Sequence, residues 1–359
     1  MIQFSALFLL ISSHLLIYSG ATTDTTLKQL FVIFRHGERA PTEPYRNDPH
    51  KDYEWPLGWG HLTNRGKLQM YTLGERIRQE YSAFIPPYYF PTNVTFFSSY
   101  ADRCLMSAQL VGAGLFPPQD EQIWNEELLW QPVPVKYVER KDDNFIAMKQ
   151  ACKKYDDMYD ELMKSDKVKK IFKDNEDLIK YLSDHSGQKM KTLYNIETLF
   201  NTLEIESLNN LTLPTWVKPE MLPVMKEIGA VNLALYSDNN YMKRMKGGVL
   251  IKIILDQMEQ FINGKASPLH LFAGHDFTLV QTLKALGLID TIKPKFGATL
   301  TFELHKDPEY KIKINYWDDY QAPPVVKILS GCTEKCDIFK FKSILEPVLP
   351  KNWNDECKV

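Results

Sequence analysis

LFVIFRHGERAP, residues 30 to 41, is the stretch that decides the fold of this 359-residue chain. Its first five residues are apolar, with β-branched and aromatic side chains among them, which is typical of a strand buried on both faces. Arg35, His36 and Arg39 follow at once, so that an imidazole lies between two guanidinium groups. A solvated loop explains this cluster poorly, because two arginines beside one histidine require an anion to neutralise them. We therefore predict an anion site at the end of a buried strand.

A helix is expected after this strand. Thr63 stands where an N-cap belongs. Apolar side chains then recur at roughly helical spacing, at Leu68, Tyr71, Ile77 and Tyr81. The pattern predicts a strand followed by a helix that ends near Tyr81.

Two later segments repeat this pattern of strand and helix. A strand over 94–99 leads through Asp102, an expected N-cap, into a helix that ends at Leu115. Another strand over 269–273 leads into a helix whose C-terminal end Gly287 is placed to cap. Alternation of this kind predicts an α/β fold, with a mostly parallel sheet flanked by helices.

The rest of the chain completes this architecture. Segments 299–304 and 312–316 alternate as expected for a hairpin on the edge of the sheet. Between 142 and 242 the sequence is rich in Lys and Asp, with apolar residues at helical spacing, and it predicts a smaller helical insertion domain. The α/β catalytic domain then consists of residues 22–141 and 243–359.

The polar residues at the three strand ends form the candidate site. His36 follows the first strand, Arg103 the second, and His275 and Asp276 the third. Taken singly, Arg103 fits an ion pair, His275 a loop imidazole and Asp276 a helix cap. In open α/β sheets, however, ligands bind at the carboxyl ends of the strands. If these strands are parallel neighbours, the groups converge on one ligand.

RHGERAP at 35–41, together with Gly274-His275-Asp276, resembles the histidine acid phosphatase family, whose fold is like that of phosphoglycerate mutases. The sequence most resembles secreted and venom-type insect members of this family. It is also similar to prostatic and lysosomal acid phosphatases. It spans nearly the whole chain after the leader. The other matching stretches are Trp55-Pro56-Leu57-Gly58, Leu62-Thr63-Asn64-Arg65-Gly66, Asp102-Arg103-Cys104-Leu105-Met106-Ser107-Ala108 and Gly247-Gly248.

This resemblance implies an enzyme that hydrolyses phosphate monoesters, with small phosphomonoesters or phosphoproteins as substrates and with no metal or other cofactor. His36 is the expected nucleophile, forming a phosphohistidine. Asp276 is the expected proton donor to the leaving group. Four side chains are expected to hold the phosphoryl oxygens: Arg35, Arg39, Arg103 and His275.

Asp276 carries two opposing demands. A helix N-terminus lowers the pKa of an aspartate, whereas a general acid must hold its proton. A bound phosphate dianion acts in the opposite direction to the helix. We therefore expect an acidic pH optimum, with activity lost as Asp276 deprotonates.

The first residues predict export. Segment 1–21 carries an apolar run over 4–17, which fits a cleaved signal peptide, with an uncleaved anchor as the alternative. No second stretch is long enough to span a membrane, so we expect a secreted protein, with the lysosomal lumen as the alternative location. The sequons at Asn93 and Asn210 are then candidate glycosylation sites. With 43 basic and 45 acidic residues, no overall field favours nucleic acid or an anionic membrane.

Five cysteines fit an oxidising compartment, and one must lack a partner within the chain. Cys332 and Cys336 are more consistent with a local disulfide than with a metal site, because no histidine accompanies them at ligand spacing. The family resemblance implies the pairs Cys152–Cys357 and Cys332–Cys336, with Cys104 free and buried.

Three alternative functions remain. Phosphoglycerate mutases share Arg-His-Gly-Glu but lack the continuation seen here and the His-Asp pair. Phytases share more of the motif and are secreted, so the substrate class is less certain than the reaction. A secreted binding protein of the same fold, without catalysis, is the alternative from another class. A homodimer is an open option.

Overall fold

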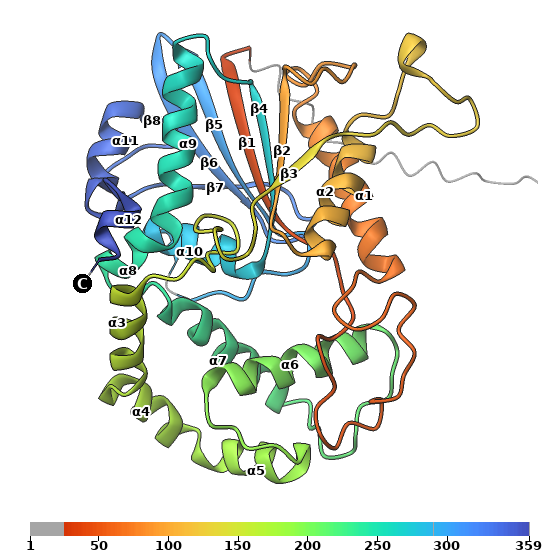
Figure 1. The fold of residues 1–359 in the computed structure, drawn as a ribbon, viewed down its shortest axis with the longest axis vertical. Coiled ribbons are helices and arrows are strands. Elements are labelled where there is room, and N and C mark those ends of the chain that lie inside the picture. Colours follow the sequence, from red (N-terminus) through yellow and green to blue (C-terminus); the bar gives the residue numbers. More distant parts are fainter. Residues whose placement is uncertain (1–24, 290, 359) are drawn as a thin grey trace, which may run out of the picture.

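The computed structural model describes residues 25–289 and 291–358, and the predicted signal peptide lies outside them. A central sheet occupies the upper part of the molecule (Figure 1). Its strands are β1 (Leu27–Arg35), β2 (Val94–Ser98), β3 (Val135–Tyr137), β4 (Leu269–Gly274), β5 (Thr299–Asp307), β6 (Glu309–Trp317), β7 (Val325–Lys327) and β8 (Cys336–Asp337).

The sheet is mixed rather than mostly parallel as predicted, because the strands after β4 pair antiparallel and form half of it. Its order is β3-β2-β4-β1-β5-β6-β7, with β8 also paired to β6. Strands β3, β2, β4 and β1 are parallel, whereas β5 to β8 are attached by antiparallel pairing. The predicted hairpin is β5 and β6, but its position on the edge was wrong. Both β7 and β8 lie outside β6, and at three and two residues they are too short for their alternation to show in the sequence.

Helices cover both faces of the sheet and continue below it, which confirms the predicted α/β class (Figure 1). Helices α1 and α2 lie on one face and α9 and α11 on the other. The helices are α1 (Asn64–Glu80), α2 (Asp102–Leu115), α3 (Lys153–Met163), α4 (Asp166–Asp174), α5 (Glu176–Ser186), α6 (Leu193–Leu208), α7 (Met221–Leu235), α8 (Asn240–Met245), α9 (Gly247–Ile262), α10 (Asp276–Ala285), α11 (Ile338–Leu345) and α12 (Trp353–Glu356), with short 3₁₀ turns at Asp120–Gln122 and Glu346–Val348.

Strand β1 is buried on both faces, as the opening stretch predicts. Phe31 and Ile33 belong to the core that contains α9, α10 and α11. Leu30, Val32 and Phe34 point the other way, into the core that contains α1 and α2. The two cores therefore hold β1 in the middle of the molecule, and its carboxyl end is fixed from both sides.

Helix α1 begins as predicted, but only part of its predicted apolar face is buried. The Thr63 hydroxyl accepts a hydrogen bond from the Gly66 amide at 3.0 Å, as an N-cap does. Ile77 and Tyr81 are buried as the pattern predicts, whereas Leu68 is 64% exposed. The packed face also contains Gly74, where an added Cβ would lie 2.3 Å from the carbonyl oxygen of Val111 on α2. The two helices thus approach each other through small residues, a contact that apolar periodicity does not reveal.

The ends of α2 and α10 show one difference from the prediction. Asp102 is the first residue of α2, and Ala101 takes the N-cap position without a side-chain hydrogen bond. Gly287, with φ of +68°, follows α10 in the left-handed conformation expected of a C-terminal cap.

Segment 142–242 contains helices α3 to α7, and no strand is assigned within it, all of its residues being described. These helices lie together beneath the carboxyl ends of the parallel strands (Figure 1). Whether the segment is a separate domain stays a prediction. In the described part of the chain, no helix is long and apolar enough to cross a membrane.

A buried pair of carboxyl groups joins the loop before α1 to helix α6. Asp48 is 2% and Glu206 1% exposed, and the hydroxyl of Tyr45 is buried with them. The His50 amide donates to Asp48 Oδ1 at 2.7 Å. Burial and the neighbouring Asp48 charge raise the pKa of Glu206 from 4.5 to about 8.

This raised pKa predicts a pH-dependent stability. Because the folded state holds the Glu206 proton more tightly than the unfolded chain, its contribution is complete below pH 4.5 and is lost as the pH rises to about 8. Glu206→Gln should therefore flatten the fall in melting temperature over that range. Thermal unfolding of both proteins across the range tests this, with Glu204→Gln on the same helix as control. An equal change in melting temperature at every pH would contradict it.

Candidate active site

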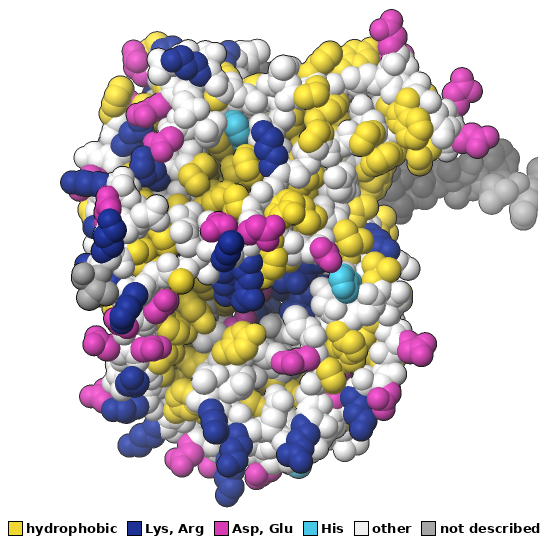
Figure 2. Space-filling view, in the orientation of Figure 1, with side chains coloured by type: hydrophobic (Ala, Val, Ile, Leu, Met, Phe, Trp, Pro, Cys, Tyr) yellow, Lys and Arg dark blue, Asp and Glu magenta, His cyan; other side chains and the backbone are white. Residues whose placement is uncertain are grey.

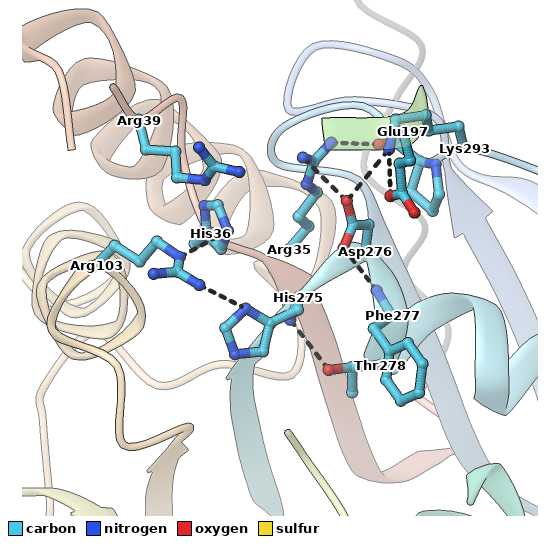
Figure 3. Close-up of polar contacts among 12 residues, drawn as sticks. Arg35, His36, Arg39, Arg103, Glu197, His275, Asp276, Phe277, Thr278 and Lys293 are labelled. Atoms are coloured by element: carbon cyan, nitrogen blue, oxygen red, sulfur yellow. Dashed lines mark hydrogen bonds and ion pairs between the residues drawn. The ribbon is translucent and has the colours of Figure 1, made fainter. Parts of the chain in front are cut away.

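The candidate site lies where three parallel strands end side by side. Arg35 is the last residue of β1, and His36 follows it. Arg103 stands in the first turn of α2, directly after β2. His275 is the N-cap of α10 and Asp276 its first residue, directly after β4. Figure 3 shows that the predicted site residues face one another across the strand ends; they are Arg35, His36, Arg39, Arg103, His275 and Asp276.

His36 is at the centre of the cluster and is only 3% exposed. Its Nδ1 lies 2.8 Å from the carbonyl oxygen of Gly37. A carbonyl oxygen only accepts hydrogen bonds, so Nδ1 carries the ring proton and donates it. Nε2 therefore carries the lone pair, and the Nε of Arg103 donates to it at 3.1 Å. Burial and the charges of Arg103, Arg35 and the other cations lower the pKa of His36 well below its ordinary value. The imidazole is neutral and its Nε2 faces the cations.

The backbone that carries His36 packs directly against the start of α1. A Cβ at Gly37 would lie 2.3 Å from the carbonyl oxygen of Gly66, and a Cβ at Gly66 would lie 1.9 Å from that of Glu38. Only two residues without side chains allow this contact. The position of His36 is thus fixed by backbone atoms rather than by flexible side chains.

Three guanidinium groups surround the imidazole. Arg35 donates to the carbonyl oxygen of Pro294 and stacks on Phe296, 4.0 Å from the ring centre. Burial, then the charges of Arg103 and Arg35, lower the pKa of Arg39 to about 10. Of the acidic residues described, none forms an ion pair with Arg39 or Arg103. A bound anion would supply the missing negative charge.

Asp276 is ionised in this arrangement. Its Oδ2 lies 3.1 Å from Nη2 of Arg35 and 3.8 Å from Nζ of Lys293, and its Oδ1 accepts from the Phe277 amide at 2.8 Å. Burial alone would raise the pKa of Asp276, but Arg35 and Lys293 outweigh it and hold that pKa well below its ordinary value. The pKa of Asp276 is thus lowered as expected, but the cause is the two neighbouring cations rather than the helix N-terminus.

His275 provides a neutral hydrogen-bonding group. Its Nε2 lies 2.9 Å from the Ser99 hydroxyl, and its Nδ1 lies 3.5 Å from Nη2 of Arg103. Burial and the charge of Arg103 lower the pKa of His275 to about 3, whereas Asp276 acts in the opposite direction. The ring stays neutral, and Arg103 links it to His36.

The site opens into a cavity of about 220 Å³. Figure 2 shows Lys and Arg side chains gathered around a hollow in the middle of this face. Beyond the phosphate-binding candidates, the lining holds one further cation, Lys149. Its aromatic wall consists of Tyr100, Tyr194, Tyr236 and Phe277.

Sequence reasoning missed the second layer around Asp276. Lys293 pairs with Glu197, and Glu197 accepts a hydrogen bond from Asn232. These residues come from a loop and two helices far apart in the chain, and none stands in a recognisable motif. No signal in the sequence alone marks them.

The cysteines pair as Cys152–Cys357 and Cys332–Cys336. Cys104 is free and buried, and burial raises the pKa of its thiol to about 12. The sequon residue Asn210 is exposed, whereas Asn93 is half-buried. Within the residues described, no group of three or more His, Cys, Asp or Glu side chains is arranged to hold a metal ion.

Comparisons with known proteins agree with this geometry. Residues 26–329 match the model of the histidine phosphatase superfamily (branch 2). The chain is 35% identical to prostatic acid phosphatase from Rattus norvegicus over 338 residues, covering 92% of this chain and 89% of the relative. It is 34% identical to venom acid phosphatase Acph-1 from Apis mellifera over 337 residues, covering 91% and 86%.

A solved structure shares the fold. The phytase from Citrobacter braakii superposes with a TM-score of 0.69 at 16% sequence identity, covering 93% of this chain and 100% of that one. At this identity the likeness concerns the arrangement of helices and strands alone.

Proposed function

Because this chain belongs to the histidine phosphatase superfamily (branch 2) and is an acid phosphatase that acts on small phosphate esters, we propose that its reaction runs through a phosphohistidine formed on His36. One observation carries the proposal. The neutral Nε2 of His36 faces guanidinium groups from two separate chain segments, and a third segment adds His275 and Asp276. A phosphate group placed among them would meet the nucleophile and its neutralising charges at the same point.

The first step transfers the phosphoryl group to the histidine. Phosphate oxygens compete for Arg103, which frees the Nε2 lone pair that its Nε now contacts at 3.1 Å. Nε2 then forms a bond to phosphorus while the bond from phosphorus to the ester oxygen breaks. The Gly37 carbonyl holds the Nδ1 proton, so that the positive charge formed on the ring is shared with the backbone. Arg35, Arg39, Arg103 and His275 hold the phosphoryl oxygens.

The ester oxygen leaves with a proton from Asp276. In the unliganded site this carboxylate is ionised, held by Arg35 and Lys293. A phosphate dianion draws Arg35 away and adds negative charge nearby, and both changes raise the pKa of Asp276. Substrate binding thus supplies the condition under which Asp276 takes up a proton, which it holds more readily at acidic pH.

The second step regenerates the enzyme. Water attacks the phosphohistidine, the bond between phosphorus and Nε2 breaks, and inorganic phosphate is released. Asp276, now a carboxylate, accepts the proton that water loses. The two steps together leave His36 neutral and return to Asp276 the proton that it gave to the ester oxygen. Asp276 ionises again once phosphate has left and Arg35 pairs with it.

Trapping the intermediate tests this proposal. Substrate carrying labelled phosphate is mixed with enzyme and quenched in alkaline detergent within one turnover. We expect label on the protein that survives alkali and is lost in acid, because the bond between phosphorus and imidazole nitrogen is acid-labile. Label that is stable to acid, or no label during active turnover, would show that another group is the nucleophile or that water attacks directly.

The two nearer alternatives receive less support. A phytase must bind a substrate with several phosphate groups, whereas the described lining of this cavity adds one cation, Lys149, to the groups assigned to one phosphate. A binding protein without catalysis has no need for the contacts around His36 and Asp276.

The remaining features extend the proposal to the whole chain. We propose secretion through the leader over 1–21, as the venom relative suggests, with the lysosomal lumen as the alternative. Glycosylation is proposed at Asn93 and Asn210, of which Asn210 is the more exposed. Segment 142–242 is proposed to act as an insertion domain that covers the site. A homodimer stays a prediction.

A further inference from the structure

We propose that Lys293 and Glu197 form a positioning pair that sets how readily Asp276 takes up its proton. This inference rests on the proposed role of Asp276 as the proton donor. Neither residue is assigned to bind phosphate or to react. They act on the reaction through the carboxyl group that Lys293 contacts.

The geometry places Lys293 between two carboxylates. Its Nζ lies 2.9 Å from Oε1 of Glu197 and 3.8 Å from Oδ2 of Asp276. The second oxygen of Glu197 accepts from Asn232 Nδ2 at 2.7 Å. Figure 3 shows Glu197 and Lys293 beside Asp276, on the side away from His36 and Arg103.

The pair is built from separate elements and is shielded from water. Glu197 stands on α6 and Asn232 on α7, whereas Lys293 belongs to the segment between α10 and β5. The side chains of Lys293 and Glu197 are 2% and 7% exposed. Charges buried in this way interact strongly with their neighbours, because little water screens them. The pair therefore acts on Asp276 more than two surface charges at the same distances would.

The two members act on Asp276 in opposite directions. The ammonium group of Lys293 favours the carboxylate form of Asp276, and the carboxylate of Glu197 disfavours it by partly cancelling that charge. A pair that only tied α6 to the sheet would need no third contact. Here the lysine also reaches the carboxyl group of the site, so that Glu197 limits how firmly Lys293 holds Asp276 ionised.

Other groups act on Asp276 as well, and they stay unchanged in the test. Arg35 makes the closest ion pair and is the largest of the neighbouring charges. The charged and titratable side chains that surround Asp276 or line the cavity with it are Arg35 at the end of β1, His36 and Arg39 after it, Arg103 and Cys104 on α2, Lys149 before α3, Tyr194 and Glu197 on α6, Tyr236 after α7, His275 before α10, and Lys293.

These charges determine the direction in which each substitution shifts the alkaline limb of kcat. Lys293→Met removes the cation and leaves Glu197, so that Asp276 keeps its proton to higher pH and the alkaline limb of kcat moves upward by about one pH unit. Glu197→Gln leaves Lys293 uncompensated, and the limb moves to lower pH by about half a unit. The double variant removes the cation together with the carboxylate that limits it, so the limb is expected to move upward, by no more than in Lys293→Met.

The experiment measures kcat against pH for the full-length enzyme with β-glycerophosphate, whose poor leaving group depends on proton donation. Lys295→Met is the matched control for Lys293, since it removes an exposed lysine two residues away that pairs with Asp318 and Asp319. Glu204→Gln is the control for Glu197 on the same helix. Opposite shifts for the two single variants, with neither control moving the limb, support the proposal.

Two results would overturn it. The first is a shift of the limb in the same direction in both single variants. The second is an equal loss of kcat at every pH, which is what loss of a merely structural ion pair would cause. If a single variant does not fold, the double variant removes both charges together and is the one to measure, since buried ion pairs are often replaced by neutral residues without loss of stability. An unmoved limb in that double variant then contradicts the proposal.

Failure of the proposed function is a distinguishable result. Asp276→Asn should abolish the alkaline limb altogether. If this variant keeps the limb of the unaltered enzyme, Asp276 is not the proton donor, and both proposals fall. If the limb disappears in Asp276→Asn but stays in place in the Lys293 and Glu197 variants, only the positioning pair is wrong.

Discussion

Replacing His36 with alanine is expected to lower kcat by at least about 10⁴-fold, which places it below detection in ordinary assays. The reason is the position of Nε2, which carries a lone pair and contacts Arg103, with Arg35 and Arg39 on the other sides of the ring. His275 does not replace it, because its Nδ1 and Nε2 are engaged with Arg103 and Ser99. No other described side chain in the cavity presents a nucleophile at that point.

The measurement combines turnover with trapping. Release of phosphate is followed for para-nitrophenyl phosphate, and the labelled protein is analysed in the same preparations. His36→Ala should lose turnover and label together, while phosphate still competes for binding to the arginines. His185→Gln removes an exposed histidine from α5 and serves as control. Label retained in His36→Ala would assign the nucleophile to another residue.

Asp276→Asn is expected to have the second largest effect, but only for esters with poor leaving groups. General acid help contributes roughly 10²- to 10⁴-fold, so that hydrolysis of β-glycerophosphate should fall by that factor. Para-nitrophenyl phosphate releases a stable phenolate that needs no proton, and its rate of phosphoryl transfer should fall much less. The substitution also removes one negative charge beside Arg35, which should tighten the binding of phosphate.

The comparison of the two substrates is the decisive reading. kcat for each ester is measured against pH in both proteins, and the rate of label uptake separates the first step from the second. In the unaltered enzyme, activity toward the poor substrate should decline from acid to alkaline pH as Asp276 loses its proton. An equal loss for both esters in Asp276→Asn would mean that this carboxylate positions Arg35 rather than donating a proton.

The sequence predicted the parts of this molecule whose causes are local. The apolar run of β1 requires burial on both faces, and Thr63 carries its own capping oxygen, so both could be predicted from the residues alone. The convergence of His36, Arg103 and His275 also followed, because parallel strands bring their carboxyl ends to one edge of a sheet. The family resemblance added the roles of these residues, and the roles stay predictions until the variants are measured.

The features that escaped depend on contacts between distant segments. Lys293 and Glu197 are 96 residues apart, and nothing near either residue indicates the other. The apolar pattern of α1 predicts the burial of Ile77 and Tyr81, but it gives no sign of the close contact with α2 through Gly74. The edge of the sheet is formed by β7 and β8, which are too short to show a period. In each case the determining interaction lies outside any window of neighbouring residues.

The contact between Gly37 and Gly66 has a consequence for how the enzyme tolerates change. Backbone atoms cannot be repacked as side chains can, so the spacing between the nucleophile and the start of α1 has no adjustable component. One added methyl group at either glycine must therefore displace the main chain. The catalytic geometry is intolerant of any side chain at these two points.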